Sequence, residues 1–458
     1  MDKVKYFTEF FEKNKSELID DFITFLKFKS ISTDPEYKSE VTNCANWLAD
    51  YIKEIGMKVD LWETEGHPVV FAQNKQTDPN LPTVLIYFHY DVQPVDPIEL
   101  WDSPPFEPEI RAGEIYARGA MDDKGQAFYV ISAIKALMQR DGKLPVNLKV
   151  CIEGEEECGS NGLKSVLKEK SSELKADHFY VVDLGIHALN RPAVTLGIRG
   201  ICTFSIELTG SKTDLHSGTH GGVAYNPLHA LVSILSEMRD KEGKITVPNF
   251  YDDVEKISAE EKSKLDLEFD LEEYKEFFGG LPNGGEKDFS PLESSWIRPT
   301  LEINGISGGY AGEGFKTVIP AKATAKVSCR LVASQDPKKI TDSVVKFIES
   351  RIPEGMEVSI HADGEGAALR SPIETSGVAA VAQAFEEVSG HKTNYILSGG
   401  SIPIAEQLAI AANAKTVLFG YGLPDDNIHA PNEHFGIERI KLGMAVVARS
   451  LEILGEGQ

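Results

Sequence analysis

The sequence predicts an α/β protein with a parallel-rich central sheet, interrupted by a smaller β-α-β-β-α-β unit of ferredoxin-like topology. Up to about residue 198, apolar strand-like runs alternate with helical segments, which is typical of a parallel-rich sheet. From 199 to 365 the elements follow the order of the ferredoxin-like split motif. The first pattern then returns, so we expect a discontinuous α/β domain, residues 1–198 and 366–458, with residues 199–365 inserted.

The first α/β segment is predicted to open with helices at 6–28 and about 40–55, the first of which carries apolar residues at helical spacing. The fully apolar run Thr83–Phe88 predicts a buried parallel strand. The other elements expected before residue 199 are strands at about 57–62 and 68–72, helix Gly125–Met138, strand 148–152, a helix near 160–170 and strand 179–183.

The inserted unit is predicted to contain four strands and two helices. In chain order these are strand Cys202–Leu208, helix Pro227–Met238, strands Thr300–Gly305 and Ala321–Val332, helix Asp336–Arg351 and strand Met356–Ala362. An acidic stretch at about 244–296 interrupts them, and we expect it to be helical and solvated. The closing segment is expected to contain helices Ser376–Ser389 and 403–409, strand Thr416–Gly420 and helix 436–454.

Composition excludes several classes of protein. The chain has 458 residues, 41% of them hydrophobic, which is enough for two or three domains with a core. Its 71 acidic and 47 basic residues give a net charge of -24, which argues against nucleic acid or an anionic membrane as a partner. Five cysteines without a CxxC pair, and no signal-like or membrane-spanning apolar run, predict a cytoplasmic protein.

Histidines and carboxylates gather at the ends of predicted strands or at the starts of helices. The segments are His89-Tyr90-Asp91, Asp122-Asp123, Glu156-Glu157, Asp183 and His429. Each alone is more often structural, as a helix cap or a solvated loop residue. Together they supply the nitrogen and oxygen ligands, with no thiolate, that hard or borderline divalent metals prefer. Strand ends of an open α/β sheet meet in one crevice, so a two-metal hydrolytic site is the favoured interpretation.

Local spacing suggests different roles within this set. His89 and Asp91 are two residues apart and share a strand face. We therefore expect His89 to bind a metal and Asp91 to hold the other nitrogen of its imidazole. The adjacent acids at 155–157 repel each other unless a cation neutralises them. Motifs of other catalytic classes are absent. There is no G-x-S-x-G elbow, and the apparent phosphate loop is rejected because Phe315 lies between Gly314 and Lys316.

These segments resemble the di-metal exopeptidase and amidohydrolase family that includes carnosinase, cytosolic dipeptidases, aminoacylase and glutamate carboxypeptidase. The matching stretches are Phe88–Pro94, Tyr116–Gly125, Glu153–Ser160, Val182-Asp183 and Gly399–Pro403. Asp214–Gly218 and Lys316–Pro320 add similarity to the dipeptidase branch. Ser398 and Asn304 depart from the family pattern, which leaves the substrate less defined than the metal site.

The resemblance implies two metals, one held by His89, Asp122 and Asp183, the other by Asp122, Glu157 and His429. Zinc is the first choice, with manganese or cobalt as alternatives. Glu156 is implied as the general base for a metal-bridged hydroxide, and Asp91 as the residue that orients His89.

The inserted unit is implied to be a lid and dimerisation domain of a homodimer. The implied substrate-binding residues are His216, Thr317, Arg330 and Ser401. His216 and Thr317 would act in the other subunit, and Arg330 would bind a substrate carboxylate. These roles predict a dipeptidase that acts on small peptides. An N-acyl-amino-acid deacylase using the same site is the alternative.

Overall fold

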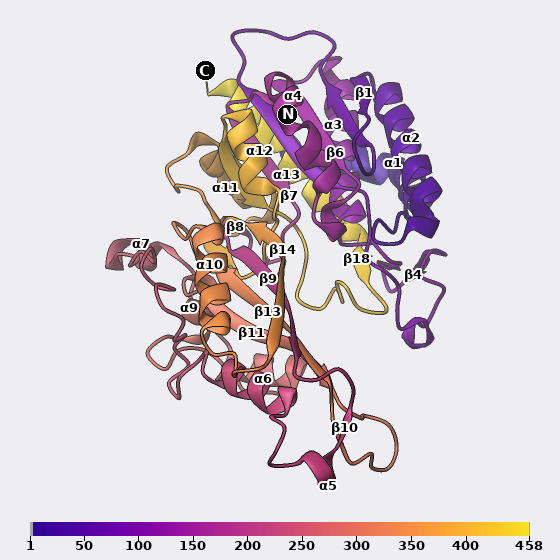
Figure 1. Cartoon of the computed structure of the whole chain (residues 1–458). Helices are drawn as coiled ribbons and strands as arrows, with labels where there is room; N and C mark the ends of the chain where they lie inside the picture. Colours follow the sequence, from indigo (N-terminus) through magenta and orange to yellow (C-terminus); the bar gives the residue numbers. More distant parts are fainter. Residues whose placement is uncertain (1–2, 458) are drawn as a thin grey trace. The chain divides into compact units, whose positions relative to one another are not determined.

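The computed structural model describes residues 3–457, which fold as two compact units (Figure 1). The first unit comprises Met1–Leu196, Arg370–Ile396 and Ile404–Gln458, and the second comprises Gly197–Leu369 and Leu397–Pro403. The short segment Leu397–Pro403 thus packs with the second unit although its neighbours on both sides belong to the first. The sequence pattern did not distinguish this segment from the closing α/β stretch.

A mixed sheet organises the first unit, in the order β1-β2-β6-β3-β7-β17-β8-β15, with β16 paired to β8. Its strands are β1 Lys58–Trp62, β2 Val69–Gln73, β3 Thr83–His89, β6 Asn147–Glu153, β7 His178–Val182, β8 Ala193–Ile198, β15 Leu369–Arg370, β16 Asn394–Ser398 and β17 Lys415–Phe419. The central strands β6, β3, β7 and β17 run parallel, whereas β1, β2 and β8 pair antiparallel. β3 and β7 are almost wholly buried, as expected for central parallel strands.

Helices pack on this sheet and on one another. They are α1 Lys3–Leu26, α2 Lys38–Ile55, α3 Lys124–Asp141, α4 Asn161–Leu174, α11 Ser376–Ser389, α12 Ala405–Ala412 and α13 Ile437–Glu456. α3 lies against α1, α2 and α13, and it is buried on nearly every side over its first three turns. It begins directly after Asp123, so a rigid, enclosed helix fixes the position of the Asp122-Asp123 pair.

The second unit has the element order β-α-β-β-α-β: β9 Gly200–Thr209, α6 Pro227–Ser236, β11 Thr300–Gly308, β13 Lys322–Leu331, α10 Pro337–Glu349 and β14 Glu357–Gly366. The strands form an antiparallel sheet in the order β11-β13-β9-β14. Alternate residues of β9 are buried, and together with residues of α6 and α10 they form the core of this unit. Apolar and polar residues alternate in this strand because successive side chains point to opposite faces of the sheet, one of which is buried.

The acidic stretch contains less helix than the sequence predicted. Residues 244–296 contain only three short helices, α7 Ala259–Lys264, α8 Leu271–Phe278 and α9 Pro291–Trp296, joined by turns. α7 and α8 bury no residue, and a helix without tertiary packing does not extend far in water. Very short strands were also missed: β4 Glu109–Arg111, β5 Glu114–Tyr116 and β18 His434–Gly436, and the β10–β12 pair of Leu215–His216 and Val318–Ile319.

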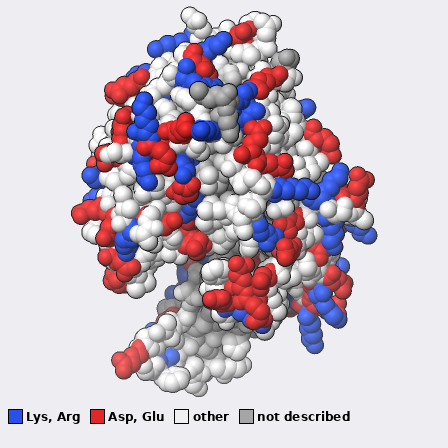
Figure 2. Space-filling view, turned by 180° about the vertical axis from the view of Figure 1, so that it is seen from behind, with Lys and Arg blue, Asp and Glu red and all other residues white. Residues whose placement is uncertain are grey.

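The surface carries both signs of charge. On the face drawn in Figure 2, acidic and basic side chains are interspersed, which suits a protein that does not track a polyanion. Within residues 3–457, none of the helices combines the length and apolarity that a membrane crossing requires.

Candidate metal centre

Three neighbouring parallel strands deliver the candidate ligands to one edge of the first unit's sheet. β3 ends at His89, β6 is followed by the turn that carries Glu156 and Glu157, and β7 is followed directly by Asp183. β3 lies between β6 and β7 and runs parallel to both, so the three carboxyl ends are adjacent. This is the edge at which open α/β sheets bind their ligands.

The five predicted ligands form two overlapping groups that share Asp122. His89 Nε2 lies 3.1 Å from Asp122 Oδ1 and 4.0 Å from Asp183 Oδ1. His429 Nε2 lies 2.9 Å from Asp122 Oδ2 and 3.5 Å from Glu157 Oε2. In each group the candidate ligand atoms all lie within 4.8 Å of one another. One carboxylate oxygen therefore faces each histidine, which is the arrangement of a bridging ligand.

The donor set fits two divalent cations. It consists of imidazole nitrogens and carboxylate oxygens, which suit borderline and hard metals. The buried Glu157 Oε1 has no hydrogen-bond partner among the described residues. Burial and the neighbouring carboxylates raise the pKa of Asp183 and of Glu157, whereas hydrogen bonds from His429 and His89 overcome burial and lower the pKa of Asp122. Positive charge at this place would offset the repulsion among the acids.

Asp91 connects the two parts of the centre. Its Oδ1 lies 3.2 Å from His89 Nδ1 and accepts a 3.1 Å hydrogen bond from the Glu156 backbone N–H. Its Oδ2 accepts hydrogen bonds from the Glu157 backbone N–H at 3.1 Å and from the Ser32 hydroxyl at 2.6 Å. Asp91 is completely buried. One carboxylate therefore orients the histidine and also holds the turn that carries two of the acids.

Glu156 lies beside the ligands but belongs to neither group. Burial is the main cause that raises the pKa of its carboxyl well above the usual value, and nearby Asp183 and Glu157 act in the same direction. Its position beside the candidate ligands makes this carboxyl group the candidate general base of a metal centre.

His429 is the most exposed of the candidate ligands, with 54% of its side chain accessible. Its φ of 60° places it in the left-handed region, which is uncommon for a residue other than glycine. Hydrogen bonds with Asp122 and Glu157 raise the pKa of His429 to about 10. The loop therefore adopts a costly backbone conformation that aims this imidazole at two carboxylates.

Besides Ser32, sequence reasoning missed two residues that support the centre. Glu433 is buried, and its Oε1 accepts 3.0 Å hydrogen bonds from the backbone N–H groups of Met121 and Asp122. Gln93 donates a 2.6 Å hydrogen bond from Nε2 to Glu157 Oε2. Gln93 stands in a matched motif and could have been considered, but Glu433 is a single acid in a loop and carries no signal of its own.

The predicted substrate-binding residues lie in the second unit and form two pairs. His216 is the register partner of Val318, and the Ser217 backbone N–H donates a 3.0 Å hydrogen bond to the Thr317 carbonyl, so His216 and Thr317 are neighbours. Arg330 Nη1 donates a 2.7 Å hydrogen bond to the Ser401 hydroxyl. The Ser401 segment is one of those that pack with the second unit.

An α/β unit in which two histidine–carboxylate groups share one aspartate is typical of metal-dependent hydrolases. The sequence model of peptidase family M20/M25/M40 matches residues 85–453, and the chain belongs to this family of metallopeptidases. It is 30% identical to the Cys-Gly metallodipeptidase dug1 of Schizosaccharomyces pombe, over 95% of each chain. It is also 30% identical to the Beta-Ala-His dipeptidase of Homo sapiens, over 90% of this chain and 86% of that protein.

Solved structures agree with these sequence matches. The M20 family metallo-carboxypeptidase Sso-CP2 from Sulfolobus solfataricus superposes with a TM-score of 0.88 at 33% identity, covering 96% of this chain and 99% of that chain. The expected family and its dipeptidase branch are confirmed.

Proposed function

We propose that the protein hydrolyses dipeptides and other short peptides that carry a free C-terminal carboxylate, with two divalent metal ions as cofactors. The observation that carries this proposal is the Asp122 carboxylate, whose oxygens face His89 on one side and His429 on the other. Asp183 would complete the first metal site and Glu157 the second. Bound there, the ions would polarise the scissile carbonyl and lower the pKa of the attacking water. Zinc is the first choice for these ligands, with manganese or cobalt as alternatives.

Glu156 is assigned as the general base. Its carboxylate would take the proton from the attacking water and pass it to the leaving amine nitrogen as the C–N bond breaks. Asp91 would fix the imidazole of His89 through Nδ1 and the backbone of Glu156 through its N–H, contacts that support this role.

The second unit is proposed as a lid and as the contact of a homodimer. His216 would stabilise the developing oxyanion in the partner subunit's active site, with Thr317 beside it. Arg330 and Ser401 would bind the carboxylate of the substrate, for which the planar guanidinium is well suited. The cytoplasmic location expected from the sequence is part of the same proposal.

The relatives' names favour a dipeptidase, because two of them are named for dipeptide substrates, Cys-Gly and Beta-Ala-His. A second candidate is a carboxypeptidase acting on longer peptides, since the relative from Sulfolobus solfataricus is named for that activity. A third is the N-acyl-amino-acid deacylase, which would need the same metals. Turnover of a dipeptide, the corresponding tripeptide and tetrapeptide, and an N-acetyl amino acid separates the three.

Replacement of Glu156 tests the mechanism. We expect Glu156→Gln to bind two metal ions per chain by elemental analysis while kcat for a dipeptide falls about 100-fold to 10,000-fold, the usual contribution of a general base. Glu155→Gln is the matched control, because Glu155 accepts a hydrogen bond from the Gly162 N–H and is outside both ligand groups. Undiminished turnover by Glu156→Gln would remove Glu156 from this role.

A further inference from the structure

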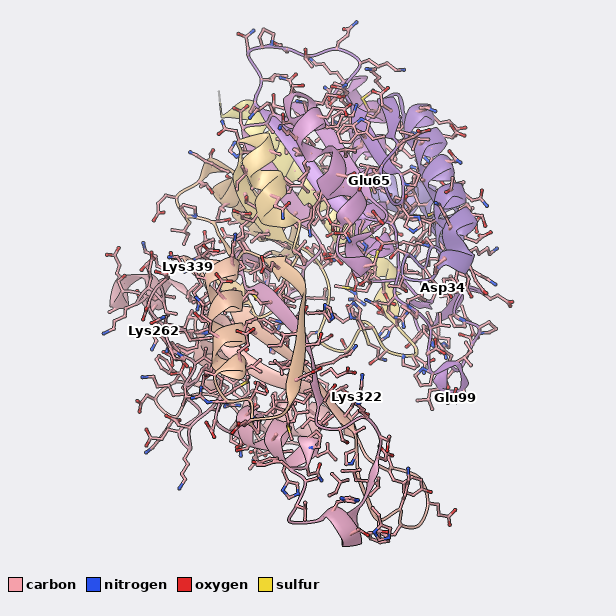
Figure 3. The ribbon with its side chains drawn as sticks, in the orientation of Figure 1. Asp34, Glu65, Glu99, Lys262, Lys322 and Lys339 are labelled. Atoms are coloured by element: carbon pink, nitrogen blue, oxygen red, sulfur yellow. The ribbon has the colours of Figure 1, made fainter. Side chains whose placement is uncertain are left out.

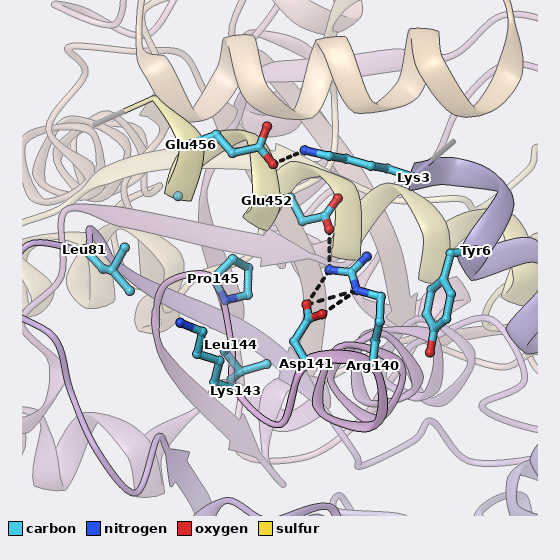
Figure 4. A pocket seen from close by; sticks show the side chains of 11 residues that line it. Lys3, Tyr6, Leu81, Arg140, Asp141, Lys143, Leu144, Pro145, Glu452 and Glu456 are labelled. Atoms are coloured by element: carbon cyan, nitrogen blue, oxygen red, sulfur yellow. Dashed lines mark hydrogen bonds and ion pairs between the residues drawn. The ribbon is translucent and has the colours of Figure 1, made fainter. Parts of the chain in front are cut away.

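Buried or half-buried arginines that lack an acidic partner are the strongest feature left unexplained by the proposed mechanism. Around Arg140, by contrast, acidic side chains neutralise the cations. A pocket of about 500 Å³ lies beside Arg140, and there Arg140 pairs with Asp141 and Glu452, and Lys3 with Glu456 (Figure 4). Those ion pairs leave the pocket without unbalanced charge from Arg140 or Lys3, so it carries no ligand assignment.

Arg199 and Arg330, both in the second unit, differ from that pattern. Over residues 3–457, neither forms an ion pair with a carboxylate; their side chains donate hydrogen bonds to carbonyl and hydroxyl oxygens. Burial and the nearby charge of Arg330 lower the pKa of Arg199 to about 10. The charge of Glu302 acts on Arg199 without forming an ion pair, so no carboxylate of the described residues binds either guanidinium directly. Two cations that repel each other without a paired acid favour the binding of an anion here.

Arg199 also holds the turn that carries Ser401. Its Nε donates a 2.9 Å hydrogen bond to the Gly399 carbonyl, and its backbone N–H donates a 2.9 Å hydrogen bond to the Gly400 carbonyl. The guanidinium lies so close to Gly399 that an added Cβ would come within 3.2 Å of Nη2. Arg199 therefore binds the carbonyl groups of both glycines in the turn, and it leaves little room for a side chain at position 399.

The same guanidinium reaches the strand beside Arg330. Arg199 Nη1 donates a 3.3 Å hydrogen bond to the Thr300 hydroxyl, and Thr300 is the register partner of Arg330 in the β11–β13 pair. Arg330 in turn donates to the Ser401 hydroxyl at 2.7 Å. The contacts run from Arg199 to the turn on one side and to the strand neighbour of Arg330 on the other.

We propose that Arg199 is a positioning residue for the substrate-carboxylate subsite: it fixes the Gly399–Ser401 turn against Arg330, so that Ser401 and Arg330 meet the carboxylate together. This inference rests on the proposed function, since it assumes that Arg330 and Ser401 bind the carboxylate. Arg199 sets the preference for a free C-terminal carboxylate over an uncharged end without taking part in bond cleavage.

The test compares Arg199→Met and Arg199→Lys with the parent protein on a dipeptide and on the same dipeptide as its C-terminal amide. We expect Arg199→Met to raise KM for the dipeptide at least tenfold, with kcat within about threefold and kcat/KM for the amide little changed, which corresponds to at least about 1.4 kcal/mol lost at the carboxylate. Arg199→Lys should recover part of the loss, because it keeps one cationic donor. Calorimetric titration of metal-free protein with both peptides repeats the comparison without turnover.

Arg239→Met is the matched control, because Arg239 also donates to glycine carbonyls, those of Gly243 and Gly284, in the same unit. It should leave the preference for the dipeptide over its amide unchanged. An equal loss on both peptides, or an unchanged preference in Arg199→Met, overturns the inference. If Arg199→Met does not fold, the ratio measured for Arg199→Lys decides. A parent protein inactive on every dipeptide would instead overturn the proposed function.

Discussion

Asp122 is placed by its backbone as much as by its side chain. Its N–H and that of Met121 donate to Glu433 Oε1, while Glu433 Oε2 accepts from Arg118 Nη1 at 2.7 Å and from the Gly119 N–H at 2.8 Å. Arg118 and Glu433 are both fully buried. Glu433, paired with Arg118, thus accepts hydrogen bonds from three backbone N–H groups of the loop that carries the shared aspartate.

Removing Glu433 should be costly. We expect Glu433→Ala to lower the free energy of unfolding by about 3–5 kcal/mol, because it leaves a buried arginine and several N–H groups without an acceptor. Urea unfolding of metal-free protein measures this. The control is Lys322→Ala, which breaks the exposed pair of Lys322, labelled in Figure 3, with Glu207 and should cost less than about 1 kcal/mol. Equal losses in the two variants would contradict the structural role of Glu433.

His178 should make stability depend on pH. Burial lowers its pKa below the usual value of 6.5, and its Nδ1 has no hydrogen-bond partner among residues 3–457. Below pH 6.5 the unfolded chain therefore takes up the proton more readily than the folded chain, so the free energy of unfolding falls as the pH drops from 6.5 toward the lower folded value. In urea unfolding of metal-free protein across pH 5–7.5, we expect His178→Gln to show a flatter dependence than the parent. Parallel curves would rule out this contribution.

Some candidate ligands stand out in the sequence because a metal-binding residue type follows an apolar run, as at His89 and Asp183, whereas the ligand role of the loop residue His429 was implied only by the family resemblance. Glu433 and Ser32 could not be predicted, because their roles come from partners distant in the chain. Glu433 meets residues more than 300 positions away, and Ser32 meets Asp91 from 59 positions away. The pairing is a property of the fold.

Among the helices, α3 and α13 approach each other closely at a glycine. A Cβ added at Gly443 in α13 would lie 2.6 Å from the ring of Tyr129 in α3. That ring also stacks on Phe435, next to the loop of the candidate ligand His429. The helix contact is thus part of what holds the α3 end that follows Asp122-Asp123.

A larger side chain at this contact should destabilise the protein. We expect Gly443→Val to lower the free energy of unfolding by about 1–3 kcal/mol, because a packed interface cannot absorb the added carbons without displacing the Tyr129 ring. Thermal unfolding followed by circular dichroism checks the direction, and urea unfolding gives the size. Gly280→Ala serves as the control, since no atom lies within 4 Å of a Cβ placed there. A Gly443→Val protein as stable as the parent would show that the helices can separate freely.

Long elements with a strong period were predictable, and short ones were not. β3 was expected at Thr83–Phe88 and ends one residue later, and α11 matches Ser376–Ser389. β10 and β12 have two residues each, too few for a pattern to appear. In the acidic stretch the charge pattern suggested helix, but solvated segments without a buried face form only short helices there.

The division into two units separates chemistry from the proposed recognition. All five candidate metal ligands, together with Glu156 and Asp91, belong to the first unit. Arg330, Ser401, His216 and Thr317 belong to the second. A cofactor that binds only the first unit can stabilise that unit directly, by an amount set by its concentration and affinity.

Metal binding should therefore protect one unit selectively. At a metal concentration about 1,000 times the Kd, the first unit gains about 4 kcal/mol against unfolding. Hydrogen-exchange mass spectrometry of metal-free and metal-loaded protein should show slower exchange in β3, β6 and β7 and little change in β9 and β13 of the second unit. Asp122→Asn is the control variant, because it weakens both proposed sites and should lose most of the protection. Equal protection of both sheets would mean that the units unfold as one body, and protection of neither would remove the metal centre from these residues.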